Sequence, residues 1–142
     1  MKAIDFLNSQ INFNIDGVKK KNKHHEELFQ IQLVSWFGYQ FPKYKRQLIA
    51  IPNGANLAMK KDRDGRWFCP QAAKLDKMGR CKGASDLFLA QPNKKFAGLW
   101  LELKWGNNKA TSDQDTFMDL MRIVGYDARI AWTMPQAQET AG

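Results

Sequence analysis

The segment Leu99–Lys104, with the sequence Leu-Trp-Leu-Glu-Leu-Lys, constrains the fold more than any other part of the chain. Successive side chains of a strand point to opposite faces of a sheet. The three leucines therefore share one face, and Trp100, Glu102 and Lys104 share the other, with the two charges roughly 7 Å apart along the strand. On a strand suited to burial, such charges are costly unless they are paired or hold a metal ion. From these residues alone, a solvent-facing Glu–Lys pair on a half-exposed strand is the more common arrangement.

Asp86 favours the interpretation of this strand as part of a site. It precedes Glu102 by sixteen residues and opens a second apolar run, Asp86–Ala90, with a polar turn at residues 92–95 in between. A hairpin of these two runs would bring both carboxylates together at one end. Paired carboxylate oxygens suit a hard cation such as Mg²⁺ or Mn²⁺. Lys104 beside them could orient a water molecule or stabilise charge that develops on a phosphate.

The rest of the chain predicts helices and strands around that hairpin. Three helices are expected, over residues 24–38, 70–78 and 112–124. Two more strands are expected at residues 48–51 and 128–132, and a separate hairpin at residues 59–69. Gly38 is expected to end the first helix and Ser112 to cap the last. This order indicates one α/β domain over residues 1–142 with a mixed central sheet flanked by helices.

The charge of the chain points towards a polyanionic partner. Twenty-two Lys and Arg against fourteen acids give a net charge of +8, which raises the local concentration of nucleic acid but does not distinguish DNA from RNA. The positive residues form four clusters, at residues 19–23, 43–46, 60–66 and 74–82. Any one cluster is most simply a solvated face, whereas the four together favour a nucleic-acid partner.

Other features of the composition narrow the class of protein. Cys69 and Cys81 lie twelve positions apart without zinc-ligand spacing, so ordinary thiols are expected. No stretch reaches the ~20 apolar residues of a membrane helix, and the N-terminus lacks the pattern of a signal peptide. A soluble, cytoplasmic protein is therefore expected.

Two stretches, Gly83–Asp86 and Gly98–Lys104, carry a resemblance to a known family. Together they resemble the Asp…Glu-x-Lys signature of the restriction-endonuclease-like, or PD-(D/E)XK, nuclease superfamily. Within it, the chain resembles a virus-type replication-repair nuclease (VRR-NUC) domain of the stand-alone phage or prophage type. The match extends over roughly residues 26–138 and includes Pro52-Asn53-Gly54, Gln114 and Gly125-Tyr126.

The chain also departs from that family. Ala84-Ser85 stands where members commonly have Val-Pro before the aspartate. Within the nuclease core at residues 24–140, residues 59–69 look like an inserted hairpin. Residues 1–23 lie outside the match and are expected to form an N-terminal arm that contacts a partner subunit or DNA.

The resemblance implies a restriction-endonuclease-like core and assigns roles to particular residues. The implied catalytic residues are Glu26, Asp86, Glu102, Lys104 and Gln114. The implied ligands of Mg²⁺ or Mn²⁺ are Asp86, Glu102, the Leu103 backbone carbonyl and, through water, Glu26. Glu27 remains an alternative to Glu26, because a shift of one residue in the alignment exchanges them. The expected nucleic-acid contacts are Gln30, Asn53, Lys60, Lys61, Arg63, Arg66 and Lys82.

The function expected from this resemblance is a metal-dependent, structure-specific DNA endonuclease. Stand-alone members resemble homodimeric Holliday-junction resolvases, which would make branched DNA, and a four-way junction above all, the substrate. A less selective nuclease, a flap nuclease or a restriction-type enzyme is the alternative within the same class. A non-catalytic nucleic-acid-binding module is the alternative from a different class.

Overall fold

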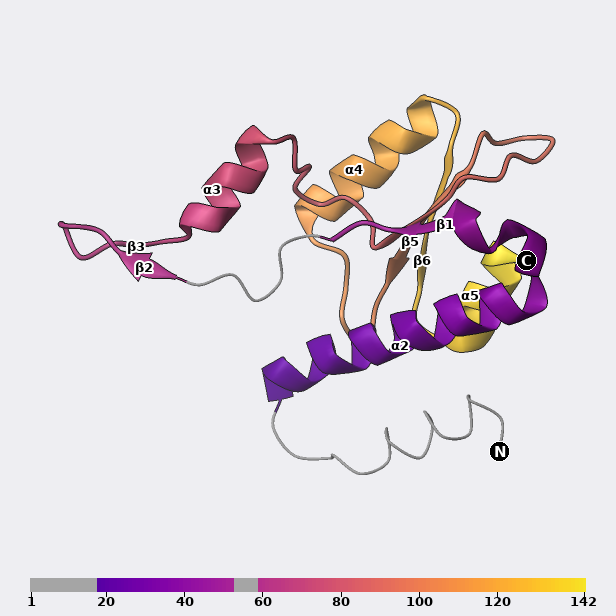
Figure 1. Cartoon of the computed structure of the whole chain (residues 1–142), viewed down its shortest axis with the longest axis horizontal. Coiled ribbons are helices and arrows are strands. Elements are labelled where there is room, and N and C mark those ends of the chain that lie inside the picture. Colours follow the sequence, from indigo (N-terminus) through magenta and orange to yellow (C-terminus); the bar gives the residue numbers. More distant parts are fainter. Residues whose placement is uncertain (1–17, 53–58) are drawn as a thin grey trace.

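A four-stranded mixed sheet forms the centre of the protein (Figure 1). The structure, a computed structural model, describes residues 18–52 and 59–142. The strands are β1 (Leu48–Ala50), β4 (Leu87–Leu89), β5 (Leu99–Leu103) and β6 (Asp127–Ala131), in the order β1-β4-β5-β6. The first three are antiparallel neighbours, whereas β5 and β6 run parallel. The predicted α/β fold with a mixed sheet and an 86–104 hairpin is confirmed.

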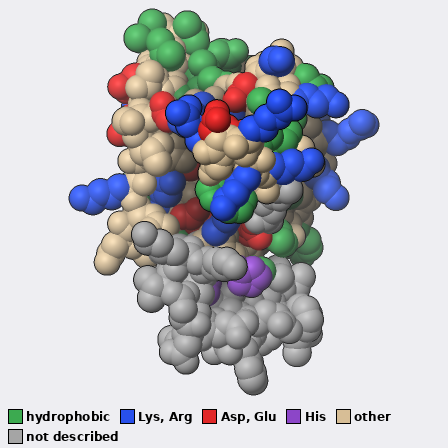
Figure 2. Space-filling model, turned by 90° about the vertical axis from the view of Figure 1, so that its left-hand side faces the viewer, with side chains coloured by type: hydrophobic (Ala, Val, Ile, Leu, Met, Phe, Trp, Pro, Cys, Tyr) green, Lys and Arg blue, Asp and Glu red, His purple; other side chains and the backbone are tan. Residues whose placement is uncertain are grey.

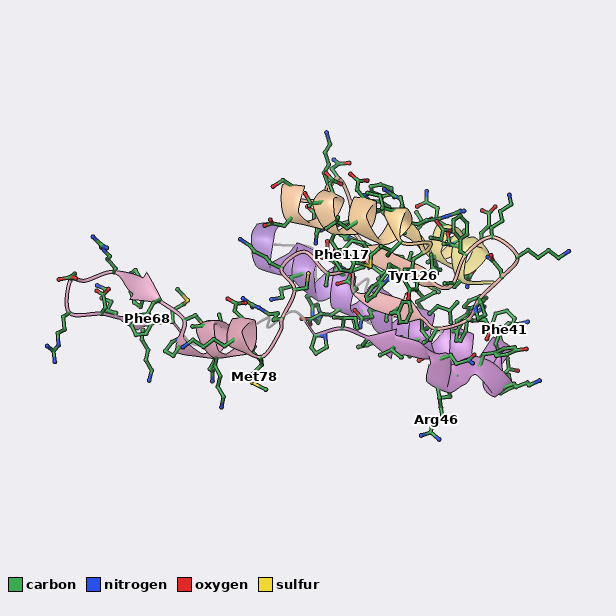
Figure 3. The ribbon with its side chains drawn as sticks, turned by 90° about the horizontal axis from the view of Figure 1, so that it is seen from above. Phe41, Arg46, Phe68, Met78, Phe117 and Tyr126 are labelled. Atoms are coloured by element: carbon green, nitrogen blue, oxygen red, sulfur yellow. The ribbon has the colours of Figure 1, made fainter. Side chains whose placement is uncertain are left out.

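Helices cover both faces of this sheet, so that the domain has three layers (Figure 1). On one face lie α2 (Val18–Gln40) and α5 (Met134–Ala141), and the three leucines of β5 pack there with Phe29, Leu33 and Phe37 of α2. On the other face lies α4 (Ser112–Ile123), which carries Phe117 (Figure 3). Phe117 makes an edge contact with Trp100, with 5.0 Å between the ring centroids. Burying each large apolar side chain contributes about 1.5–3 kcal/mol, and this burial fixes which face of β5 meets which helix.

The first helix is longer than predicted. It begins at Val18 rather than at residue 24 and passes through Gly38 to Gln40. Lysine is a good helix former and a single internal glycine costs only about 1 kcal/mol, so the helix continues until Phe41 and Pro42 begin the 3₁₀ segment η1 (Pro42–Gln47). His24 and His25 therefore lie within α2 and not at its first turn.

The other end of the chain shows two further differences. Thr111, and not Ser112, caps α4: its side chain accepts a hydrogen bond from the Gln114 backbone N–H. The helix α5 was not expected, although Thr133 caps it and a proline stands in its first turn. Of the predicted N-terminal arm at residues 1–23, residues 18–23 instead belong to α2, and residues 1–17 lie outside the described residues, as does Asn53.

The predicted hairpin at residues 59–69 is confirmed as β2 (Lys60–Lys61) and β3 (Trp67–Phe68). Asp62 closes its turn by accepting hydrogen bonds from the backbone N–H groups of Asp64 and Arg66, and Gly65 takes a φ of 77°. The hairpin leads into α3 (Pro70–Lys77), as predicted. We call residues 59–82 the basic extension, which projects away from the sheet (Figures 1 and 3).

Candidate active site

Asp86 lies directly before β4, where backbone hydrogen bonds hold it on both sides. Its carbonyl accepts from the Ile51 N–H at 2.8 Å, and its carboxylate Oδ2 accepts from the Leu103 N–H, also at 2.8 Å. Leu87 pairs with Leu101, so the register extended by one residue sets Asp86 opposite Glu102. The hairpin thus brings the two carboxylates together on the face of the sheet that α4 covers.

Gly83 allows the loop before Asp86 to approach α4. It adopts a φ of 85°, and a Cβ at this position would overlap the Asp113 backbone carbonyl. No other residue type fits both the left-handed backbone and this close approach. The loop therefore passes directly against the first turn of α4, which places Asp86 near the residues of that turn.

Glu102 and Lys104 form a buried ion pair. Only 3 % of Glu102 and 8 % of Lys104 is exposed, and Lys104 Nζ lies 3.4 Å from Glu102 Oε1. The solvent-facing alternative for this pair is therefore wrong, because α4 covers this face of β5. The same Oε1 accepts a hydrogen bond from Gln114 Nε2 at 2.7 Å.

The other oxygen of Glu102 has no such partner. Its Oε2 is buried and accepts no hydrogen bond from any residue in the described part of the chain. Burial, reinforced by the negative charge of Asp86 and only partly offset by Lys104, raises the pKa of Glu102 to about 8. Burial also raises the pKa of Asp86, against the opposing effects of the Leu103 N–H and Lys104. The positive charge of Lys104 thus does not balance the acids of the site, and an added cation would stabilise it.

Gln114 connects this site to the capping structure of α4. Its Oε1 accepts from the Thr111 N–H at 2.9 Å while its backbone N–H donates to Thr111 Oγ1 at 3.3 Å. This reciprocal pair is a capping box, which fixes the side chain of its third residue. The Gln114 amide is therefore held in place to donate to Glu102, and the cap of the helix becomes part of the site.

Glu26 reaches the same centre from α2. Its Oε1 accepts from Asn108 Nδ2 at 3.0 Å and from the Trp105 N–H at 3.3 Å. Its charge also raises the pKa of both Asp86 and Glu102. Glu27 is exposed and makes none of these contacts. Of the two alternatives, Glu26 is thus the acid that faces the site.

The sequence analysis did not identify Asn108 or the stacking of His25 on Trp105, whose ring centroids lie 4.6 Å apart. Trp105 follows Lys104 directly, and its backbone N–H donates to Glu26. The stack therefore packs α2 against the end of β5 next to the site. Proximity in the sequence to Lys104 and Glu26 was the only signal for these contacts.

The predicted nucleic-acid contacts are spread more widely. Gln30 is half-buried in α2, one turn after Glu26, and Lys82 is exposed with its Nζ 3.4 Å from Asp113 Oδ2. The other four lie on the β2–β3 hairpin, which is far from the central sheet (Figure 1): Lys60, Lys61, Arg63 and Arg66.

Comparison with known proteins identifies the fold. No family model and no curated protein matches the chain. A solved structure described as a "VRR_NUC domain protein" is similar with a TM-score of 0.61 and 24 % sequence identity over 78 % of each chain. A solved protein therefore shares the fold over most of the chain. The chain thus shares the fold of a VRR_NUC domain protein.

Proposed function

We propose that this protein is an endonuclease that hydrolyses phosphodiester bonds of DNA with the help of Mg²⁺ or Mn²⁺. The observation that carries the proposal is the carboxylate of Glu102, buried with one unpartnered oxygen between a second carboxylate and a lysine. The fold is that of a VRR_NUC domain protein, which supports the same conclusion. A residue set of this kind stores unfavourable charge in the absence of a cation, which a structural role alone does not require.

The donor set fits a hard divalent cation. Asp86, Glu102 and the Leu103 carbonyl would hold it with oxygen atoms alone, as Mg²⁺ and Mn²⁺ prefer. Within residues 18–52 and 59–142, no three His, Cys, Asp or Glu side chains are arranged to hold a metal ion together. Glu26, already engaged by Asn108 and the Trp105 N–H, would therefore act through water. When bound, such an ion polarises the phosphoryl oxygen and lowers the pKa of water.

Lys104 and Gln114 would support the hydrolysis. In hydrolysis a water molecule gives up a proton as its oxygen bonds to phosphorus, the bond to the leaving sugar oxygen breaks, and that oxygen takes up a proton. The Lys104 ammonium, fixed against Glu102, would stabilise the negative charge that grows on the phosphate oxygens. Gln114 would hold the Glu102 carboxylate in one orientation, since its amide is itself fixed by the capping box.

The finer proposal is that branched DNA is the substrate. The net charge of +8 supports a nucleic-acid partner. The family resemblance of the sequence suggests DNA, and a homodimeric Holliday-junction resolvase of phage or prophage origin acting in the bacterial cytoplasm. A flap, restriction-type or less selective nuclease is the alternative use of the same site. A passive DNA-binding module is disfavoured, because the buried Asp86 and Glu102 would repel phosphate without a cation.

Cleavage assays with four substrates would test both the metal-dependent nuclease activity and the preference for branched DNA. The protein is incubated with a four-way junction, a flap, a plain duplex and a single strand, each with Mg²⁺ or Mn²⁺. We expect the wild-type protein to cut DNA, and a chelator to abolish this cutting. Asp86→Asn and Lys104→Ala should each lose the cleavage activity but still bind DNA. Lys94→Ala, which removes an exposed lysine from a turn, is the matched control and should cut normally.

Each outcome of this assay separates two hypotheses. Paired, symmetric nicks in the junction support the resolvase, whereas cutting of the flap alone supports a monomeric repair nuclease. Undiminished cutting by Asp86→Asn, in protein whose thermal unfolding is normal, would contradict the assignment of the site.

A further inference from the structure

The basic extension carries most of the net charge of the protein. Residues 59–82 hold eight Lys and Arg against three Asp, a net charge of +5 out of +8 for the whole chain. Those 24 residues are a small part of the 142. Such a concentration of charge on one element calls for an explanation beyond solubility.

The extension contributes almost nothing to the hydrophobic core. Every residue of β2 and β3 is exposed, and α3 has no buried residue. Within the described part of the chain, the hydrogen bonds of residues 59–80 join residues of the same segment, such as Asp62 with Arg66 and Asp76 with Arg80. The packing of the domain therefore does not explain why the extension carries these particular side chains on its surface.

Most of its cations are free to bind another molecule. Arg80 pairs with Asp76 and Lys82 with Asp113. The other six form no ion pair with any described residue: Lys60, Lys61, Arg63, Arg66, Lys74 and Lys77. Figure 2 views the molecule from the side on which the extension projects and shows Lys and Arg side chains gathered there.

Aromatic rings lie among these cations on the hairpin. Trp67 is 63 % exposed and Phe68 is 42 % exposed, which is unusual for rings of this size on a solvated ribbon. Lys61 pairs with Trp67, its Nζ 5.0 Å from the ring centroid, and Lys60 pairs with Phe68. Each face of the ribbon thus presents a cation beside a ring, the combination on which nucleic-acid backbones and unstacked bases are held.

The base of the extension joins the candidate active site. Lys82 contacts Asp113, and Gly83 packs on the Asp113 carbonyl, one residue before Gln114. DNA held on the extension would therefore be led towards the carboxylates. A second copy of this chain is a poorer occupant, because its own extension carries the same +5 and would repel this one.

We propose that the basic extension is a second DNA-binding surface, separate from the catalytic centre. Its Lys and Arg side chains contact phosphates of the DNA beside the cleavage site, and Trp67 stacks on a base that loses its stacking neighbour at a branch point. The choice of DNA as the partner rests on the proposed function, whereas the binding surface itself rests on the charges and rings of the extension.

Binding measurements without metal test this surface independently of cleavage. The affinity of the full chain for a four-way junction and for a duplex of equal length is measured by fluorescence anisotropy, in chelator, between about 0.05 and 0.3 M salt. The test variant replaces Lys60, Lys61, Arg63 and Arg66 with Ala. The matched control replaces Lys43, Lys45, Arg46 and Lys94, four exposed cations elsewhere on the protein, with Ala.

The two charge variants should differ, although their net charges are equal. We expect the test variant to bind at least ~10-fold more weakly, with a salt dependence shallower by about two to four counterions. The control should lose much less. Equal losses in both would show that only net charge matters and would overturn the proposal. An altered oligomeric state of the test variant with unchanged DNA affinity would overturn it in favour of a subunit interface.

Trp67 provides the second readout. Trp67→Ala should reduce the preference for junction over duplex by about 10-fold, and Trp67→Phe should retain most of it. An unchanged preference in Trp67→Ala would remove stacking from the proposal. Wild-type protein that binds but never cuts would refute the proposed function alone, whereas a test variant that binds and cuts normally would refute this inference alone.

Discussion

The candidate active site and the basic extension differ in how far water screens their charges. At the site, Asp86, Glu102 and Lys104 lie against apolar layers, where burial raises the pKa of both acids. On the basic extension, the charges are exposed to water and salt. Charges in the first region interact strongly and are costly to the fold, whereas those in the second are screened and contribute little to stability. Substitutions at the site should therefore change stability and activity together, and those on the extension should change DNA binding alone.

Lys104→Ala should have the largest effect. It removes the only cation recorded in contact with Glu102 among the described residues, so cleavage should fall by about 10²–10³-fold. Stability should fall by about 1–3 kcal/mol near pH 8 and by less near pH 5, where the two acids can take up protons. Cleavage rates and chemical denaturation measure the two effects. Lys94→Ala should change neither the cleavage rate nor the stability. An equal effect of both substitutions would show that the buried lysine contributes no more than an exposed one.

Glu102→Gln should stabilise the protein in the absence of metal, increasingly so as pH rises. An acid with a raised pKa keeps its proton longer in the folded than in the unfolded state. The wild type therefore loses stability as pH rises from the ordinary Glu value of 4.5 to about 8, and Asp86 contributes in the same direction. Glu102→Gln has no such proton to lose, and its cleavage activity should disappear.

Thermal unfolding in chelator from about pH 5 to about pH 8.5 measures this effect. The melting temperature of Glu102→Gln should exceed that of the wild type by several degrees at the upper end and by little at the lower end. Glu139→Gln, an exposed acid on α5, is the control. A wild-type stability that is independent of pH in this range would show that Glu102 is not buried as a charge.

These contrasts also mark what the sequence could predict. Alternation in Leu99–Lys104 was sufficient to assign the two faces of β5, and the turn at residues 92–95 was sufficient to bring Asp86 towards Glu102. These are local patterns, fixed by the period of a strand. They placed the two acids and Lys104 on one face without any knowledge of which helix would cover it.

Features that depend on packing between distant elements could not be predicted. Whether Glu26 or Glu27 faces the site is decided by Asn108 and the Trp105 N–H, about 80 residues away in the chain. The length of α2 depends on its packing against β5 and α5, and α5 itself is too short to show a clear period. That β2, β3 and α3 have no buried residue could not be predicted either, because charge clusters alone do not reveal how an element packs.

Glu26→Gln tests whether that distant acid belongs to the site. It removes one negative charge from the site and weakens the hydrogen bond from Asn108. Activity should therefore fall by about 10-fold, the effect expected of one charged hydrogen bond. Glu27→Gln removes the same charge one position away on the exposed side and should be nearly silent. Steady-state cleavage with varied Mg²⁺ measures both. A greater loss in Glu27→Gln would reverse the alignment of α2 with the site.

Gln114→Ala separates the helix cap from the site. Losing the capping box costs about 1 kcal/mol, and Thr111→Ala should cost a similar amount. Only Gln114→Ala also removes the hydrogen bond to Glu102, so only it should reduce cleavage, by several-fold. Denaturation and cleavage are measured for both variants. Equal losses of activity would mean that the cap, and not the Glu102 contact, is what the site needs.

The double substitution Lys74→Ala and Lys77→Ala should have the smallest effect on the fold. Both lysines lie in the last turn of α3, which has no buried residue, so only the favourable interaction with the helix dipole is lost. Stability should change by less than about 0.5 kcal/mol, and this small difference should vanish as salt rises. Denaturation at low and high salt measures it. A salt-independent loss of several times this size would mean that α3 packs on the rest of the protein, and the charges of the extension would then serve the fold as those of the site do.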